Sequence, residues 1–370
     1  MRIESITLRR LKMRLKAPFE ASFGTSWERP VLLVEMRADG VTGWSEITVN
    51  GEPFYNSETT LTAWHVCRDF LIPSVLGKSI STSSEIGKLF PAIRGHEMAR
   101  AGIENALWDA EARQKGTPLW KLIGGIQEEI PCGVSLGLQG KVDDLLKRIE
   151  EELAAGYQRI KIKIKPGTDL EYTAAVRKGF PSVQLMVDAN SAYCLEQADH
   201  LKRFDAFHLM MMEQPLSWDD IFCHAKLQAQ LQTPICLDEC IHSIHHAQAA
   251  VELKACKIIN IKVGRVGGHT AAREIENYCR GHQIPVWCGG MLESGIGRAH
   301  NVAMSTLPGF TLPGDVSASH RYYNEDLIEP AVEVTPQGTI RVPKTPGIGY
   351  EVRRDLVERL TEEKATWNAK

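Results

Sequence analysis

Five titratable residues recur at near-constant spacing in the middle of this 370-residue chain. They are 25, 25, 25 and 24 residues apart, and each closes a short apolar or alternating run typical of a β-strand. They are Lys163, Asp188, Glu213, Asp238 and Lys262. A lone aspartate at such a position is usually a helix cap, but capping does not select lysine at two of five positions. We therefore expect the five residues to share a chemical function.

Three carboxylates side by side would repel one another and raise one another's pKa, and a divalent cation removes that penalty. Ligands that are all oxygen, without His or Cys, favour Mg²⁺ over Zn²⁺, with Mn²⁺ as a usable substitute. A lysine near other cations has a lowered pKa, so a neutral amine can act as a base. The set suits removal of a proton α to a carboxylate, while the metal stabilises the enediolate.

The segment Arg159–Lys165 indicates how such residues are positioned. Isoleucine and lysine alternate along it, and the lysines are Lys161, Lys163 and Lys165. If the strands close into a barrel, the isoleucines face the outer helices and the lysines point inward. The carboxyl ends of the strands then meet at one mouth, where barrel enzymes build their active sites.

From Ile130 onward, strand and helix patterns alternate in seven or eight short units, which predicts a (β/α) barrel rather than an open sheet. The predicted strands are Pro131–Leu136, Arg159–Lys165, Gln184–Asp188, His208–Glu213, Ile235–Asp238, Lys257–Lys262, Pro285–Cys288 and a short one near Thr311. The predicted helices include Val142–Ala155, Cys194–Phe204, Ile221–Leu231, Ile244–Leu253 and Ala271–Gly281.

The remaining chain predicts a smaller α+β domain. Residues 1–125 contain two strands, Ile3–Leu15 and Pro30–Asp39, followed by helical periodicity at Ser57–Leu71 and Met98–Lys115. Two segments rich in small and polar residues, Ala17–Trp27 and Asn50–Asn56, predict binding loops. We expect residues 1–125 to form a capping domain and residues 126–321 the catalytic barrel, with residues 322–370 returning to the capping domain.

Composition excludes several partners. The formal net charge of −3 gives no reason to expect nucleic acid or an anionic membrane surface, and no apolar run is long enough to span a bilayer. The N-terminus shows no signal-peptide pattern, and the nine cysteines include no Cys-x-x-Cys pair, so we expect reduced thiols and a cytoplasmic location.

The motifs around the five residues resemble those of the enolase superfamily. The resemblance is to the muconate-lactonising-type subgroup, and within it to the o-succinylbenzoate synthase/N-succinylamino acid racemase branch. It extends from Ser22-Phe-Gly-Thr25 to the segment Leu312–Ser319. The motifs are Lys161-Ile-Lys163, Val187-Asp188-Ala-Asn190, Glu213-Gln-Pro215, Leu237-Asp238-Glu239, Asn260-Ile-Lys262-Val-Gly-Arg265 and Gly289-Gly-Met-Leu-Glu-Ser-Gly-Ile-Gly297.

The resemblance implies a role for each matching residue. Asp188, Glu213 and Asp238 would bind Mg²⁺, and Lys163 and Lys262 would be the acid/base pair on opposite faces of the substrate. Further implied roles are neutralisation of the substrate carboxylate by Lys161, indirect support from Asn190 and Glu239, tuning of Lys262 by Arg265, and a succinyl pocket lined by Ser135, Gly290, Met291 and Leu292.

The resemblance implies two reactions on a small carboxylate substrate. One is the syn-dehydration of 2-succinyl-6-hydroxy-2,4-cyclohexadiene-1-carboxylate to o-succinylbenzoate, a menaquinone precursor; the other is racemisation of N-succinyl or N-acyl amino acids. We rank dehydration first, and dipeptide epimerase or muconate cycloisomerase activity lower. The subgroup implies a homo-oligomer, a dimer or an octamer. Cys240, where the family often has serine, and the loop Asn50–Phe54 depart from the pattern.

Two other classes of protein, a Schiff-base aldolase and a binding barrel, are alternatives to a metal-dependent enzyme. A Schiff-base aldolase on a barrel would use Lys163 or Lys262 as a nucleophile, but it would not need three carboxylates at consecutive strand ends. A binding barrel without catalysis would not depend on either lysine or on a metal. Borohydride trapping with substrate would identify the aldolase, and insensitivity to EDTA and to Lys163→Ala would identify the binding barrel.

Overall fold

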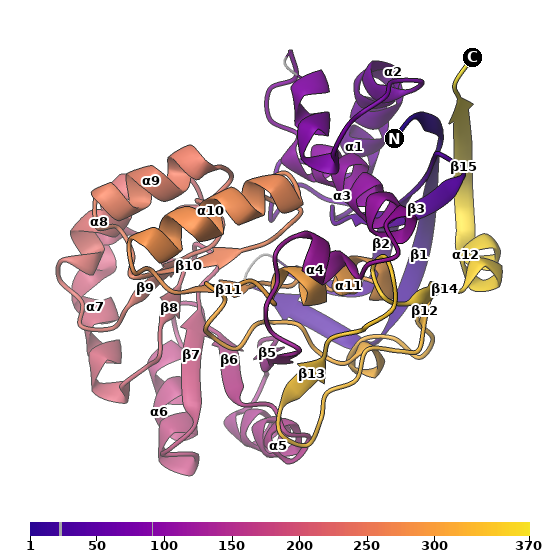
Figure 1. Ribbon diagram of the computed structural model, residues 1–370. Coiled ribbons are helices and arrows are strands. Elements are labelled where there is room, and N and C mark those ends of the chain that lie inside the picture. Colours follow the sequence, from indigo (N-terminus) through magenta and orange to yellow (C-terminus); the bar gives the residue numbers. More distant parts are fainter. Residues whose placement is uncertain (22–23, 91) are drawn as a thin grey trace.

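The computed structural model describes residues 1–21, 24–90 and 92–370. An antiparallel sheet with helices lies beside a barrel of parallel strands, and both chain termini lie in the antiparallel part (Figure 1). The predicted fold class, a barrel with an α+β capping domain that the C-terminal tail completes, is confirmed.

The capping domain is built on a four-stranded antiparallel sheet of order β15-β1-β2-β3. Its strands are β1 (Ile3–Ala21), β2 (Gly24–Ala38), β3 (Val41–Ile47) and β15 (Thr361–Asn368). Helix α3 (Glu97–Gln114) packs closely on this sheet because small residues face it. A Cβ atom added at Gly102 would lie 2.2 Å from Ile47 Cγ1, and one at Gly43 would lie 2.0 Å from the carbonyl oxygen of Ala106.

Seven parallel strands form the barrel sheet, in the order β11-β10-β9-β8-β7-β6-β5. They are β5 (Gly133–Leu136), β6 (Arg159–Lys163), β7 (Gln184–Asp188), β8 (Met212–Glu213), β9 (Ile235–Leu237), β10 (Ile258–Ile261) and β11 (Val286–Cys288). The segment 310–315 closes the gap between β11 and β5, since it forms parallel bridges with Val286 on one side and Cys132 on the other. This segment is the predicted eighth unit near Thr311.

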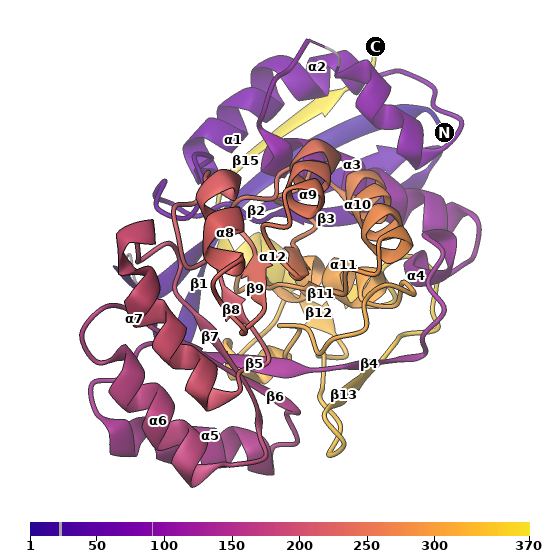
Figure 2. The same ribbon diagram turned by 90° about the vertical axis from the view of Figure 1, so that its left-hand side faces the viewer.

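Helices surround the outside of the barrel (Figure 2). They are α5 (Val142–Ala154), α6 (Asp169–Gly179), α7 (Ala198–Lys202), α8 (Ile221–Gln228), α9 (Ile244–Glu252), α10 (His269–Gly281) and α11 (Gly295–Met304). The smaller elements are α1 (Thr60–Val66), α2 (Ile72–Val75), α4 (Leu119–Leu122), α12 (Arg354–Leu360), β4 (Glu129–Pro131), β12 (Ile328–Glu329), β13 (Thr339–Arg341) and β14 (Glu351–Val352).

Strand β6 shows the alternation that the sequence predicts. Ile160, Ile162 and Ile164 are buried in the core between the barrel and its helices. On the other face, Lys161 lies inside the barrel, with its ammonium 5.0 Å from the ring centre of Trp287. Lys165 is the exception: it lies beyond the end of β6 and is exposed, so its predicted inward direction is wrong.

The predicted helix Cys194–Phe204 contains only one short α-helix, α7, between two 3₁₀ turns, and two further predicted elements differ more from the structure. The segment Ala17–Trp27 is not a loop in its described part, because β1 and β2 extend through it and pair residues 19–21 with residues 24–26. Ser22 and Phe23 of the Ser22-Phe-Gly-Thr25 motif lie outside the described residues. The predicted strand His208–Glu213 is reduced to Met212–Glu213, because His208 takes a left-handed conformation and ends the preceding helical turn.

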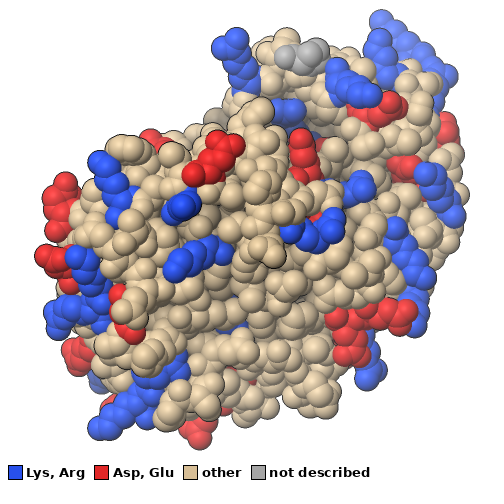
Figure 3. All heavy atoms as spheres, turned by 60° about the vertical axis from the view of Figure 1, so that its left-hand side comes forward, with Lys and Arg blue, Asp and Glu red and all other residues tan. Residues whose placement is uncertain are grey.

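One face of the molecule shows how the surface charges are distributed (Figure 3). Acidic and basic side chains are interspersed over the face shown in Figure 3. Within the part of the chain that the structure describes, no helix is long and apolar enough to cross a membrane.

Candidate active site

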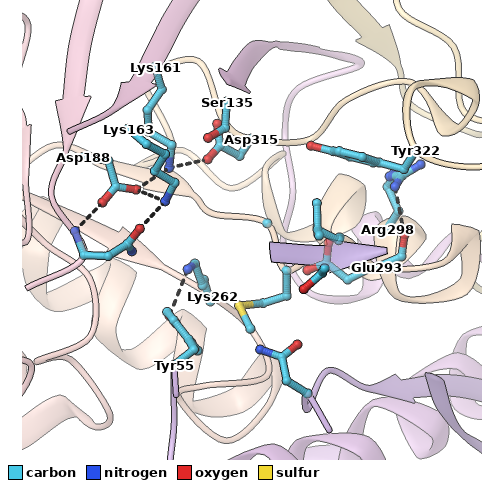
Figure 4. A pocket seen from close by; sticks show the side chains of 16 residues that line it. Tyr55, Ser135, Lys161, Lys163, Asp188, Lys262, Glu293, Arg298, Asp315 and Tyr322 are labelled. Atoms are coloured by element: carbon cyan, nitrogen blue, oxygen red, sulfur yellow. Dashed lines mark hydrogen bonds and ion pairs between the residues drawn. The ribbon is translucent and has the colours of Figure 1, made fainter. Parts of the chain in front are cut away.

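The barrel fold brings the five spaced residues to one mouth. Lys163, Asp188 and Glu213 are the last residues of β6, β7 and β8, while Asp238 and Lys262 directly follow β9 and β10. A cavity opens at this mouth under the capping domain (Figure 4). Nine of the thirteen predicted site residues line it: Ser135, Lys161, Lys163, Asp188, Asn190, Lys262, Gly290, Met291 and Leu292. The other four, Glu213, Asp238, Glu239 and Arg265, are buried and do not line it.

Lys161 is a buried cation shared by several carboxylates. Its ammonium lies 2.8 Å from Glu213 Oε2, 3.2 Å from Asp188 Oδ2 and 2.6 Å from Asp315 Oδ2. Burial lowers the pKa of Lys161, but the three carboxylates outweigh burial and hold that pKa well above its ordinary value. Lys161 is therefore an ammonium at the base of the cavity.

Lys163 is held in place by the last residue of β7 and by a residue just beyond that strand. Its Nζ donates to Asp188 Oδ2 at 2.6 Å and to Asn190 Oδ1 at 2.5 Å. Asn190, in a left-handed conformation (φ 42°), donates its amide Nδ2 to Glu239 Oε1 at 2.9 Å. Asn190 thus links Lys163, the predicted base, to Glu239. Glu239 was predicted to support the site without binding the metal directly.

Lys262 approaches the cavity from a different side than Lys163 (Figure 4). Its Nζ donates to Asp238 Oδ2 at 2.8 Å and to the Tyr55 hydroxyl at 2.9 Å. Arg265 contacts the same Asp238 carboxylate and donates to the same hydroxyl at 2.9 Å. The sequence predicts a lowered lysine pKa beside a metal ion. Among the protein groups alone, burial lowers the pKa of Lys262, but Asp238, Tyr55 and Glu213 together outweigh burial and raise it.

Two of the carboxyl groups at the mouth, Glu213 and Glu239, have raised pKa values. Burial and the nearby Asp188 and Asp238 carboxylates raise the pKa of Glu213 to about 7. Burial, and the same two carboxylates, raise the pKa of Glu239 to about 8. One oxygen of Glu213 accepts from Asn260 Nδ2 at 2.8 Å. A further cation at this position would lower the energy of the cluster.

The three predicted metal ligands are turned onto cationic side chains. Within residues 1–21, 24–90 and 92–370, no three Asp, Glu, His or Cys side chains form a group placed to hold a metal ion. Asp188 and Glu213 nevertheless contact one and the same ammonium, so these two carboxylates can share a cation. Their oxygen chemistry, burial and mutual repulsion fit a hard divalent ion.

Several residues of the site were missed by sequence reasoning. Asp315 pairs with both Lys161 and Arg159, and Tyr55 bridges Lys262 to Arg265. Asp315 lies in the segment Leu312–Ser319, which carried part of the resemblance, and Tyr55 lies in the unassigned loop Asn50–Asn56. Neither position has a spacing relative to the strand ends that could have identified it. Three other residues that line the cavity were not predicted: Glu293, which lies within the motif Gly289–Gly297, and Arg298 and Tyr322, which lie outside the motifs.

The capping domain anchors the loop that carries Gly290, Met291 and Leu292. Glu46, on β3, accepts hydrogen bonds from Ser294 N at 2.9 Å and Ser294 Oγ at 2.6 Å. Ser294 is the residue before α11, so a capping-domain carboxylate closes the N-terminus of a barrel helix. The wall of the cavity is thereby fixed between the two parts of the fold.

Cys240, which departs from the family pattern, is buried beside Gln214. Its thiol is buried and accepts a hydrogen bond from Gln214 Nε2 at 3.0 Å. Gln214 follows Glu213 in a left-handed conformation (φ 37°) and accepts from Asp238 N at 3.0 Å. Burial raises the pKa of the Cys240 thiol to about 12, so it is not a nucleophile near neutral pH.

Comparison with protein families gives matches over both parts of the chain. Residues 3–124 match the mandelate racemase/muconate lactonizing enzyme N-terminal domain, and residues 144–356 match the enolase C-terminal domain-like family.

Known relatives cover almost the whole chain. An o-succinylbenzoate synthase from Geobacillus stearothermophilus is 52% identical over 97% of this chain and 96% of its own length. An N-succinylamino acid racemase from Thermus thermophilus is 44% identical over 98% of each chain. A solved structure of an enolase superfamily member from Listeria innocua superimposes with a TM-score of 0.96 at 40% identity, covering 100% of this chain and 99% of that one.

Proposed function

The chain belongs to the enolase superfamily, and within it we propose that the protein is an o-succinylbenzoate synthase that also racemises N-succinyl amino acids. Both reactions begin with removal of a proton α to a carboxylate. The observation that carries the proposal is that Lys163 and Lys262, each fixed by a carboxylate from an adjacent strand, border one cavity from different sides.

In the dehydration, the α-proton and the leaving hydroxyl group lie on the same face of the substrate. Lys163 Nζ takes the α-proton and then returns a proton to the departing hydroxyl group, which leaves as water. Lys262, held by Asp238 and Tyr55, stays an ammonium on the other face and stabilises negative charge there. The aromatic product, o-succinylbenzoate, would serve menaquinone synthesis.

We propose that Asp188, Glu213 and Asp238 hold a Mg²⁺ ion, with Mn²⁺ as a substitute. The ion would supply positive charge for the carboxylate oxygens of the substrate as the α-proton leaves. Lys161, the buried ammonium already placed among these carboxylates, adds positive charge at the same end of the cavity.

Racemisation is the second candidate and needs both lysines in alternating roles. One lysine removes the α-proton from one face, and the other delivers a proton to the opposite face. Arg265 supports this activity, because it contacts the Asp238 carboxylate and the Tyr55 hydroxyl that also hold Lys262. Relatives at 49 to 52% identity are named synthases and those at 44% racemases, so we rank dehydration first.

Proton NMR in D₂O with Mg²⁺ tests the proposal. N-succinyl amino acids are followed for α-deuteration, and an ultraviolet assay follows o-succinylbenzoate formation in parallel. Deuteration without any aromatic product would make racemisation the main function. No exchange and no product would refute the proposal, and a panel with dipeptides and muconolactone would then identify another branch.

Two control experiments distinguish the proposed enzyme from a Schiff-base aldolase and from a binding barrel. Treatment with borohydride in the presence of substrate would leave a covalent adduct on a Schiff-base aldolase and none on this enzyme. EDTA should abolish turnover, and added Mg²⁺ or Mn²⁺ should restore it, whereas a binding barrel would be indifferent to the chelator.

A further inference from the structure

The capping domain contributes one polar side chain to the cavity whose orientation is fixed from behind. Asn50 lines the main cavity and also an adjoining hollow toward the outside, where Trp27 and Phe54 are exposed. Arg29, which is only 3% exposed, donates from Nη1 to Asn50 Oδ1 at 2.7 Å. Because a guanidinium group can only donate, the amide oxygen must face Arg29. The NH₂ group of Asn50 is then the part left for a ligand.

No acceptor for Asn50 Nδ2 is found among the described residues. The amide oxygen is committed, so the side chain offers the cavity a donor and no acceptor. Arg29 itself is kept in place by Glu46, whose Oε1 lies 3.3 Å from its Nη2. Glu46 in turn binds Ser294, so the orientation of Asn50 is tied to the wall of the barrel.

Two buried guanidinium groups lie at or behind the lining of this cavity, and each also faces a carboxylate. A cation that donates to an amide oxygen polarises the amide and makes its NH₂ group a stronger donor. A second buried guanidinium, Arg298, lines the same cavity, with its Nη1 lacking a hydrogen bond and lying 3.9 Å from Asp326. Glu293, which also lines the cavity, accepts a hydrogen bond from Asn301 Nδ2 at 2.9 Å through its Oε1.

Both proposed substrates carry a second acceptor besides the reacting carboxylate. Lys161, Lys163 and Asp188 lie together on one side of the cavity, and Glu293, Arg298 and Tyr322 on the other (Figure 4). In the proposed function the reacting carboxylate lies with the lysines. Both proposed substrates carry another carboxylate at the end of a succinyl chain, and that group is the anion available to the other donors that line the cavity, Asn50 among them.

We propose that Arg29 holds the Asn50 amide so that its NH₂ group donates to the terminal carboxylate of the succinyl chain. Asn50 is then a substrate-binding residue and Arg29 a positioning residue. The inference rests on the proposed function, since it concerns which acyl groups that function accepts. It assigns a role to the loop Asn50–Asn56, which the sequence left unexplained.

Calorimetric binding of two ligands in the presence of Mg²⁺ tests the inference without turnover. The ligands are the N-succinyl and N-acetyl derivatives of the same amino acid, which differ in the terminal carboxylate. Asn50→Asp replaces the donor with an acceptor and should reduce the preference for the N-succinyl ligand by about 10- to 100-fold. Arg29→Lys keeps the charge but cannot bind Asn50 and Glu46 together, so it should give a smaller loss of the same preference.

Asn56→Asp is the matched control. It lies in the same loop outside the cavity lining, and its side-chain oxygen accepts from Glu58 N at 2.8 Å, which aspartate preserves. The preference of this variant should not change. If Asn50→Asp does not fold, as judged by circular dichroism, Asn50→Ala measures the same ratio.

The possible failures are distinguishable. An unchanged ratio in folded Asn50→Asp or Asn50→Ala protein, with wild-type protein active on N-succinyl amino acids, would overturn the inference alone. Wild-type protein that acts on neither N-acyl amino acid, and makes no o-succinylbenzoate, would overturn the proposed function.

Discussion

The replacement Asp315→Asn is expected to destabilise the protein through the cations that this carboxylate serves. Asp315 lies between two buried cations, with Oδ1 2.7 Å from Arg159 Nη2 and Oδ2 2.6 Å from Lys161 Nζ. Burial raises the pKa of Asp315, but Arg159 and Lys161 outweigh burial and hold it well below its ordinary value. The carboxylate therefore contributes stability above its ordinary pKa, and this contribution is lost as the pH falls through the lowered value.

The loss of unfolding free energy depends on which hydrogen-bond and ion-pair partners Lys161 and Arg159 retain. Removing one partner of a buried pair costs about 3 to 5 kcal/mol, because a desolvated charge is left unpaired. Lys161 keeps Asp188 and Glu213, and Arg159 keeps the carbonyl oxygens of Pro313 and Val134. We therefore expect the free energy of unfolding to fall by about 3 kcal/mol, at the lower end of the range.

Urea unfolding at pH 7 measures this change, with Glu128→Gln as the control. Glu128 pairs with Lys344 at 3.2 Å, but both side chains are more than half exposed, so this variant should lose no more than about 0.5 kcal/mol. A loss for Asp315→Asn that is as small as that of the control would refute the reasoning, because it would mean that Lys161 and Arg159 do not need the Asp315 carboxylate.

Three further predictions concern catalysis and pH. Lys163→Ala should reduce dehydration by about 10² to 10⁴-fold, whereas Lys262→Ala should abolish racemisation and leave part of the dehydration; equal losses in both assays would contradict the assigned faces. Gly289→Ala would place a Cβ atom 2.7 Å from Lys262 Cε, so kcat/KM should fall by at least about tenfold, while Gly140→Ala, with open space around it, should be neutral. Burial lowers the pKa of the His224 imidazole from 6.5 to about 4. The unfolded chain therefore binds a proton at a higher pH than the folded protein does, and the free energy of unfolding should fall by about 3 kcal/mol as the pH falls from 6.5 through 4. His224→Gln should flatten that part of the curve of unfolding free energy against pH, and an unchanged slope would contradict the assignment.

The sequence by itself determined the barrel and the ring of titratable residues at its mouth. The alternation in Arg159–Lys163 requires one face in the core. The near-constant spacing of strand ends brings Lys163, Asp188 and Glu213 into register and places Asp238 at the same mouth, two residues past the register partner of Glu213. These features depend on periods along the chain, which a sequence displays directly. The extent of β1 and β2 through residues 17–27 could not be read in this way, because pairing with a neighbouring strand overrode the local composition.

Only the tertiary structure decided which residues complete the site. Asp315 closes the ring because segment 310–315 fills the gap between the first and last strands, and Tyr55 reaches Lys262 because the capping domain folds over the barrel mouth. Arg29 and Asn50 are 21 residues apart, on a strand and just beyond its neighbour, and they meet through the packing of the sheet. Such contacts arise from long-range packing, and no local period in the chain records them.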